Sequence, residues 1–172
     1  MTFAIGFLVL RLVVGLTVAA HGAQKLFGWF GGPRIAGFAG MLEKLGIAPS
    51  RPWAIIAGLT EFLGGLSIAA GFLTTLGSLA VAGSMAVAII TVHLSKGFWN
   101  RNGGYEFPLV LAAAALALSL IGPGSMSLDA LLRIQLPEPA TWIAMAVLVL
   151  LAIAGTVVLP RLRERQRRLQ VG

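Results

Sequence analysis

The chain has 172 residues, of which 58% are hydrophobic and 11% are charged, and its mean hydropathy is +0.91. These values are far from the averages of water-soluble domains and indicate a membrane protein. Because the sequence has no cysteine, it excludes disulfide exchange, iron–sulfur clusters and thiolate metal sites within this chain. The net charge of +7 would suit nucleic acid, but the positions of the charges favour membrane lipids as the partner, with no nucleic acid.

Five apolar segments reach or approach the length of about 20 residues that a helix needs to cross a bilayer. They cover residues 3–26, 52–72, 75–95, 106–122 and 140–159. The connections between them are too short for a separate soluble domain. We therefore expect an all-α membrane protein: a four-helix transmembrane bundle over residues 3–132, followed by one additional C-terminal transmembrane helix.

The segments between the spans carry local signals of their own. In residues 31–46 the apolar residues recur at helical spacing, which predicts an amphipathic helix near 34–45 that lies in the membrane interface. Residues 96–105 are expected to form a loop whose aromatic side chains suit the headgroup region. After residue 122 we expect a turn and then a short helix capped by Ser127.

Basic residues lie almost entirely on one side of the predicted membrane. The opposite side receives only Arg133. The positive-inside rule then places the N-terminus outside and the C-terminus, with its basic tail over residues 160–172, in the cytoplasm. The basic residues of the cytoplasmic side are Arg34, Lys44, Arg51, Lys96, Arg101, Arg161, Arg163, Arg165, Arg167 and Arg168, with Lys25 at its edge.

Two ionisable residues fall deep inside the predicted spans. Ionisable groups within a bilayer are costly and usually face the interior of a bundle. Counted from the ends of their spans, Arg11 and Glu61 reach comparable depths, and small residues beside Glu61 would let a neighbouring helix approach closely. We therefore expect Arg11 and Glu61 to form an ion pair, which either fixes helix packing or has a functional role.

A second polar layer is expected nearer the cytoplasm. His21 and Lys25 share one face of the first span with Arg11. The third span ends with His93, and the fourth begins with Glu106. These four side chains are expected to converge into one ligand-binding pocket whose floor is the pair of Arg11 and Glu61.

The chemistry of this set favours some ligands over others. Two histidines and a carboxylate can bind a metal ion, but two nearby lysines oppose a cation, so no metal is predicted. A proton relay, or a pocket for a small anion or a quinone, fits the residues better. The sequence shows no pairing of a nucleophile with a base, so no catalytic residue is predicted.

The sequence also resembles the DoxX family of bacterial membrane proteins over residues 3–132. The resemblance is carried by Arg11, "HGAQKLFG" (21–28), Glu61 with the glycines that follow it, His93 and "GGYEFPLVLAAAALALSLIGPGSMSLD" (103–129). It implies a four-helix bundle in the bacterial inner (plasma) membrane, to which the span at 140–159 is an addition. It also implies association with quinone-linked or oxidative-stress systems, with a quinone as the candidate cofactor.

Three functions remain open on these grounds. The first is a membrane subunit of a redox system, with the polar pocket holding a quinone or another small molecule and with other redox subunits as partners. The second is a proton-coupled carrier of a small solute or anion, gated by Arg11 and Glu61. The third is a non-catalytic assembly subunit of a larger membrane complex. Whether the protein is itself an enzyme is left undecided by the sequence.

The charge asymmetry makes a prediction about topology. Reporter fusions placed after Leu73 and after Gly172 should report opposite sides of the membrane, because an odd number of spans separates these positions. Activity of a periplasmic reporter at the first site and of a cytoplasmic reporter at the second is the expected pattern. Two fusions that report the same side would contradict the predicted topology.

Overall fold

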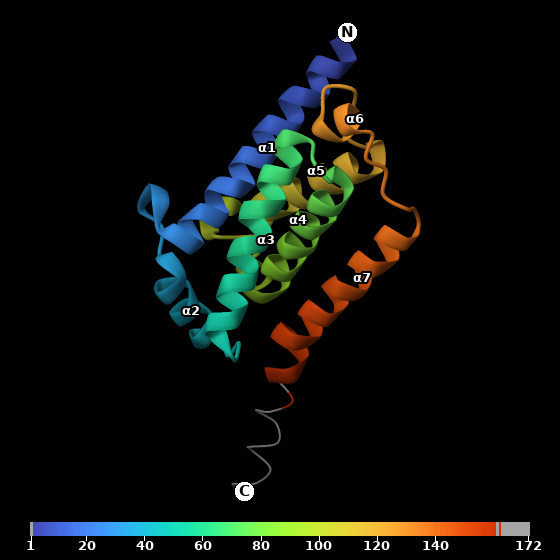
Figure 1. The fold of residues 1–172 in the computed structure, drawn as a ribbon. Helices are drawn as coiled ribbons and strands as arrows, with labels where there is room; N and C mark the ends of the chain where they lie inside the picture. Colours follow the sequence, from blue (N-terminus) through green and yellow to red (C-terminus); the bar gives the residue numbers. More distant parts are fainter. Residues whose placement is uncertain (1, 161, 163–172) are drawn as a thin grey trace, which may run out of the picture.

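The computed structural model describes residues 2–160 and 162, whose path is shown in Figure 1. Every regular element in this part of the chain is a helix, which confirms the all-α expectation. The main helices are α1 (Thr2–Phe27), α2 (Arg34–Lys44), α3 (Ser50–Ala70), α4 (Thr74–Ala88), α5 (Glu106–Ile121), α6 (Leu128–Leu132) and α7 (Ala140–Ile153). The basic tail predicted for residues 160–172 lies almost entirely outside the described residues.

Four helical stretches are long and apolar enough to cross a membrane. Two of them are α1 and α3, and the other two continue beyond α4 and α7 through π-helical turns, η2 (Ile89–His93) and η5 (Ala154–Val158), to give Thr74–Lys96 and Ala140–Val158. The fifth apolar helix, α5, has only 16 residues, about 24 Å at 1.5 Å per residue against a hydrocarbon thickness of about 30 Å. The structure therefore supports four spans by length, and the expected count of five is not confirmed.

The long helices pack as a bundle with one helix on its outside. Helix α3 packs against α1 and α4, α5 packs against α4, and α7 lies along α4 (Figure 1). The start of α1 and the short helix α6 lie at one end of the bundle, called here the α6 end. Helix α2 and the end of α7 lie at the other, called the α2 end. The two ends carry different polar groups, described below.

Helices α1 and α3 approach so closely that their backbones touch. A β-carbon built on Gly65 would lie 2.4 Å from the backbone nitrogen of Ala19 and 2.5 Å from the carbonyl oxygen of Gly15. One built on Gly22 would lie 2.3 Å from the backbone nitrogen of Phe62. Only glycine fits at such crossings, as is common where helices associate in membranes. These contacts fix the antiparallel register of α1 against α3.

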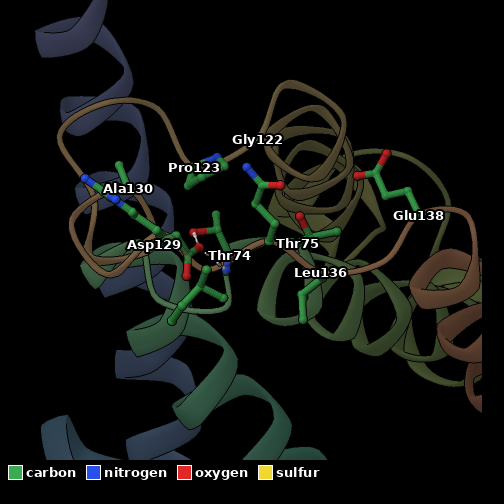
Figure 2. A pocket seen from close by; sticks show the side chains of 11 residues that line it. Thr74, Thr75, Gly122, Pro123, Asp129, Ala130, Leu136 and Glu138 are labelled. Carbon is green, nitrogen blue, oxygen red and sulfur yellow. Dashed lines mark hydrogen bonds between the residues drawn. The ribbon is translucent and has the colours of Figure 1, made fainter.

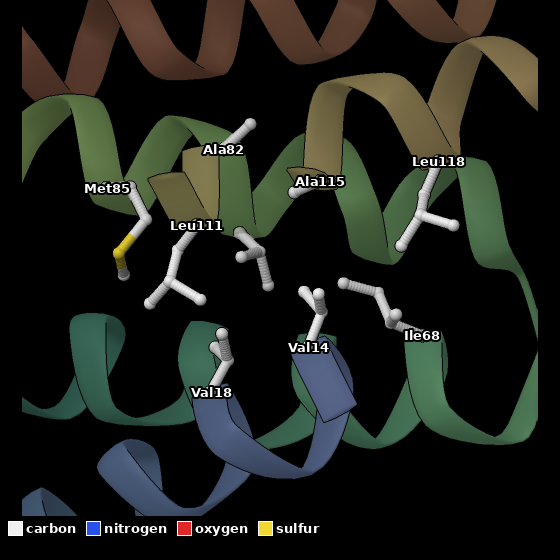
Figure 3. Packing of buried hydrophobic residues seen from close by; sticks show 9 residues of the cluster. Val14, Val18, Ile68, Ala82, Met85, Leu111, Ala115 and Leu118 are labelled. Carbon is white, nitrogen blue, oxygen red and sulfur yellow. The ribbon is translucent and has the colours of Figure 1, made fainter. Parts of the chain in front are cut away.

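An apolar cluster fills the middle of the bundle between its two ends (Figure 3). It takes residues from α1, α3, α4 and α5, and its members are between 0% and 7% exposed. Such a cluster is packed at the density of protein interiors and leaves little room for water. Its members are Val14, Val18, Ile68, Val81, Ala82, Met85, Leu111, Ala115 and Leu118.

The backbone contact between α1 and α3 predicts that replacing glycine by alanine changes stability differently at Gly65 and at Gly6. Gly65→Ala should destabilise the protein by about 1–3 kcal/mol or more, because the methyl group meets backbone atoms that cannot move away easily. Gly6→Ala, also within a helix, meets nothing within 4 Å and should be neutral or slightly stabilising. The apparent melting temperatures of the two variants in detergent measure the difference. Equal values would contradict the packing described here.

Candidate functional site

Glu61 is the centre of a buried charged cluster in the bundle. It lies on α3 and is 1% exposed. Its Oε1 forms a salt bridge with Nζ of Lys25 from α1. The hydroxyl of Ser84 from α4 donates a hydrogen bond to the same oxygen at 3.3 Å. Three helices thus contribute a cation, an anion and a hydroxyl to one point, which we call the Lys25–Glu61 site.

The register of α1 against α3 explains why Lys25 meets Glu61. The crossing of Gly22 with Phe62 brings the last turns of α1 beside this part of α3. Gly58 faces the same turns, since a β-carbon built on it would lie 3.6 Å from the β-carbon of Lys25. The side chain of Leu26 fills the space at Gly58, since its Cδ2 would lie 2.7 Å from a β-carbon built there, and this close packing holds the last turns of α1 against α3.

One oxygen of the carboxylate is left without a partner. Oε2 of Glu61 is buried and has no hydrogen-bond partner in the described part of the chain. A buried acceptor that is not hydrogen-bonded costs about 1–3 kcal/mol. The site therefore offers a free acceptor next to an ammonium donor, an arrangement that suits a ligand with both hydroxyl and carbonyl groups and that can exchange a proton with it.

Lys25 connects this buried site to α2. Its side chain is 22% exposed, and its ammonium lies 4.9 Å from the ring centroid of Phe38 on α2. A cation over an aromatic face is attracted by the ring's electron density. The helix at Arg34–Lys44 agrees with the amphipathic helix expected from the sequence, and it covers the lysine side of the site.

Arg11 does not pair with Glu61, so the predicted ion pair is wrong. Its guanidinium instead donates hydrogen bonds to the carbonyl oxygens of Pro123 and Met126, each at 2.5 Å. Arg11 and Lys25 are about 21 Å apart along α1 at 1.5 Å per residue, and only Lys25 lies level with Glu61. Counting residues from opposite ends of two antiparallel helices misjudged the register that the glycine contacts set.

Arg11 belongs to a second polar cluster, at the α6 end, that includes Asp129. The carboxylate of Asp129 accepts hydrogen bonds from the backbone nitrogens of Leu73 and Thr74, at 2.7 and 2.9 Å, and from the hydroxyl of Thr74 at 2.7 Å. It thus caps the N-terminus of α4, where a negative charge is stabilised. The expected cap of α6 by Ser127 is present, with Ala130 donating to its hydroxyl at 3.1 Å.

Sequence reasoning missed Asp129, although a signal for it existed. The residue at the N-cap position of α4 is Leu73, which has no side-chain acceptor. A helix that starts inside a membrane protein without its own capping side chain needs an acceptor from elsewhere. Asp129, in a short polar segment after the neighbouring span, was the nearest candidate of that kind.

The other predicted site residues lie near the α2 end in separate contacts. The ring of His21, one turn before Lys25, lies 5.6 Å from the ring of Phe107 on α5. Nδ1 of His93 is 2.7 Å from the carbonyl oxygen of Gly103. Oε2 of Glu106 accepts a hydrogen bond from the backbone nitrogen of Asn100 at 2.9 Å. His93 and Glu106 therefore hold the loop between α4 and α5.

Of the six predicted residues, the structure brings Lys25 and Glu61 into direct contact and places Arg11 at the other end of the bundle. A single pocket that joins the Lys25–Glu61 site to His21, His93 and Glu106 stays a prediction. Within the described residues no three or more histidine or acidic side chains gather as a metal site would require.

Comparison with known proteins gives the family. The family model named DoxX matches residues 6–94, more than half of the chain. The chain belongs to the DoxX family. Its matched part contains Arg11, His21, Lys25, Glu61 and His93, whereas Glu106 and Asp129 follow it.

Curated relatives of this DoxX protein cover most of its length. A Bacillus subtilis protein named "Putative oxidoreductase CatD" is 31% identical over 128 residues, 74% of this chain and 87% of the relative. The Escherichia coli "Inner membrane protein YqjF" is 32% identical over 123 residues, 70% of this chain and 93% of the relative. A Mycobacterium tuberculosis protein named as an uncharacterized membrane protein is 28% identical over 130 residues, 70% of this chain and 77% of the relative. No solved structure matches the chain. The protein is thus a multi-pass membrane protein whose helices contact lipid.

The geometry of the Lys25–Glu61 site predicts non-additive mutational effects. Lys25→Met should cost about 3–5 kcal/mol because it leaves the carboxylate buried without a counter-ion. Glu61→Gln should cost less, since the partly exposed ammonium of Lys25 can turn toward the membrane surface. The joint Lys25→Met, Glu61→Leu variant should be more stable than Lys25→Met alone. Thermal unfolding in detergent checks this order, and additive losses would show that the two side chains are not coupled.

Proposed function

We propose that this protein is a bacterial inner-membrane subunit of a redox system and that it binds a quinone or a related small ring molecule at the Lys25–Glu61 site. The observation that carries the proposal is the buried, unpartnered Oε2 of Glu61 beside the ammonium of Lys25. Membrane-embedded ionisable groups are expensive, so their presence favours a function over a purely structural role.

The chemistry of the site fits both oxidation states of such a molecule. A quinone has carbonyl oxygens, which accept a hydrogen bond from the ammonium of Lys25. A quinol has hydroxyl groups, which donate to Oε2 of Glu61. Because the two states differ by protons as well as electrons, an adjacent carboxylate is a suitable group to take up or supply a proton.

The surroundings of the site suit a lipid-soluble ring. Phe38 lies against Lys25, and Leu26 of α1 packs at Gly58, so apolar groups adjoin the two charges. Binding sites for small molecules usually combine apolar walls with few polar groups in fixed positions. His21 lies one turn before Lys25 on α1 and contacts Phe107 of α5. We propose that these two rings extend the apolar wall toward α5.

The names of two relatives agree with this assignment. One carries the name "Putative oxidoreductase CatD" and the other the name "Inner membrane protein YqjF". We extend these properties to the present chain as part of the proposal, together with an outside N-terminus, a cytoplasmic C-terminus and redox proteins as partners.

A proton-coupled carrier has less support. A carrier needs a polar path that opens to each side of the membrane in turn. In the described residues the apolar cluster lies between the Lys25–Glu61 site and the Arg11–Asp129 cluster, since its members Val14 and Val18 fall between Arg11 and Lys25 on α1. The gate that the carrier hypothesis required, a pair of Arg11 with Glu61, is not formed.

Binding of a quinone analogue tests the proposal directly. The protein in lipid nanodiscs is titrated with decylubiquinone and with a short-chain menaquinone, and quenching of its four tryptophans reports binding. Saturable binding is expected for the native protein. Glu61→Gln and Lys25→Met should weaken it about tenfold or more, since a hydrogen bond to a charged group contributes about 1.5–3 kcal/mol.

A matched variant controls for nonspecific effects of charge. Glu43→Gln removes an exposed carboxylate from α2, near the same end of the bundle, and should leave the affinity within about twofold of the native value. Native protein that shows no saturable quenching beyond empty nanodiscs would overturn the proposal. So would a folded Glu61→Gln variant with native affinity.

A further inference from the structure

A hollow lies at the α6 end, far from the Lys25–Glu61 site. It has a volume of about 630 Å³ and lies among the start of α4, the end of α5, α6 and the segment that leads to α7 (Figure 2). Its lining includes a basic residue, Arg133, an acidic residue, Glu138, and two neutral polar residues, Thr75 and Gln135. Apolar residues such as Leu136 complete it.

The carboxylate of Asp129, which lines the hollow, is already hydrogen-bonded within the protein. Both carboxylate oxygens of Asp129 accept hydrogen bonds from Leu73 and Thr74 at the start of α4. The helix N-terminus is therefore neutralised from within the protein and is not available to an anion. A ligand in this hollow has to be recognised by Arg133, Glu138 and the neutral polar side chains.

Arg133 occupies a backbone conformation that favours glycine. It is the C-cap of α6, with φ 55° and ψ 38°, in the left-handed region. Glycine or asparagine is the usual residue at such a helix end. The arginine at this position therefore carries backbone strain at the edge of the hollow that it lines.

Arg133 and Glu138 both line the hollow and are both exposed. Figure 2 shows Glu138 well separated from Asp129 and Ala130 of α6. Neither Arg133 nor Glu138 forms a salt bridge with another side chain in the described part of the chain. The hollow thus presents a positive and a negative charge, both open to a ligand.

The position of α6 indicates the depth of the hollow in the membrane. Leu131 is 75% exposed and Leu132 is 57% exposed, so the helix presents a leucine surface toward lipid. A short helix with such a surface lies at the boundary between hydrocarbon and headgroups. The neighbouring hollow is then at the level of the phospholipid headgroups.

We propose that this hollow binds the headgroup of a phospholipid that carries both a phosphate and a primary ammonium, as phosphatidylethanolamine does. The guanidinium of Arg133 binds the phosphate, for which its planar set of donors is suited. The carboxylate of Glu138 binds the ammonium, which has three hydrogen-bond donors. A phosphatidylglycerol headgroup has no cation for Glu138, and the quaternary ammonium of phosphatidylcholine has no N–H to donate.

Native mass spectrometry of the purified, delipidated full-length protein tests the proposal. The protein is incubated with equal amounts of phosphatidylethanolamine, phosphatidylglycerol and phosphatidylcholine, and the bound lipid is measured for each. The expected result is a preference of about tenfold for phosphatidylethanolamine over each of the other two, equivalent to about 1.4 kcal/mol. Equal retention of the three lipids would overturn the proposal.

Variants separate the roles of the two charges. Arg133→Gln should lower the retention of all three phospholipids, because each carries the phosphate, while the preference for phosphatidylethanolamine over phosphatidylcholine remains. Glu138→Gln should remove the preference over phosphatidylglycerol while leaving phosphate binding intact. Arg101→Gln, which removes an exposed arginine near the α2 end, is the matched control and should bind like the native protein. A loss in Arg101→Gln as large as that in Arg133→Gln would overturn the assignment of the phosphate to Arg133.

Two further experiments test whether the bound molecule is a lipid or a soluble compound, and whether its binding is independent of the Lys25–Glu61 site. Free phosphoethanolamine at millimolar concentration should not displace the lipid, because the acyl chains contribute to its binding. Displacement would show that the site takes a soluble headgroup compound and would contradict a lipid site. Glu61→Gln should leave lipid retention unchanged, so that this proposal and the quinone proposal fail or succeed separately.

Discussion

The direct backbone contact between α1 and α3 determines where the charges of this protein lie. Gly15, Gly22 and Gly65 allow the two helices to approach until only a hydrogen atom fits between them. At that distance neither helix can slide along the other without a steric clash, so one antiparallel register is selected. That register places Lys25 beside Glu61 and moves Arg11 to the opposite end of the bundle.

The separation of the two polar clusters by an apolar cluster gives each end of the bundle its own chemistry. At the α2 end, Lys25 and Glu61 form a buried pair with an unused acceptor. At the α6 end, Arg11 donates hydrogen bonds to backbone carbonyls of the loop after α5. Asp129 accepts hydrogen bonds from backbone nitrogens at the start of α4. The first arrangement joins side chains of α1, α3 and α4 to one another, whereas the second ties side chains to backbone groups. Nε of Arg11 is buried without a hydrogen-bond partner in the described part of the chain, but the bonds that Arg11 and Asp129 do form hold the loop after α5 and the start of α4 in place.

The sequence predicted the fold class and the positions of the helices well, because a bilayer imposes strong constraints on composition and length. It also identified both members of the Lys25–Glu61 site as unusual, since charges inside apolar segments stand out. It assigned Glu61 the wrong partner, because register depends on which backbone atoms touch, and hydrophobic patterns do not encode that contact. The glycines beside Glu61 indicated close packing but did not indicate at which residue of α1 it occurs. Asp129 was missed because its role depends on a helix 55 residues away in sequence.

The capping of α4 by Asp129 has a consequence for how the protein is made. A ribosome completes α4 well before it reaches residue 129, so the first turn of α4 enters the membrane with unsatisfied backbone nitrogens. The hydrogen bonds of Arg11 form after an even longer stretch of synthesis, since its partners Pro123 and Met126 are more than a hundred residues downstream. Until α5 arrives, the guanidinium has no internal partner and must stay near water. Final placement of the first helix therefore belongs to a late stage of insertion, when α5 and α6 join the bundle and before α7 is added.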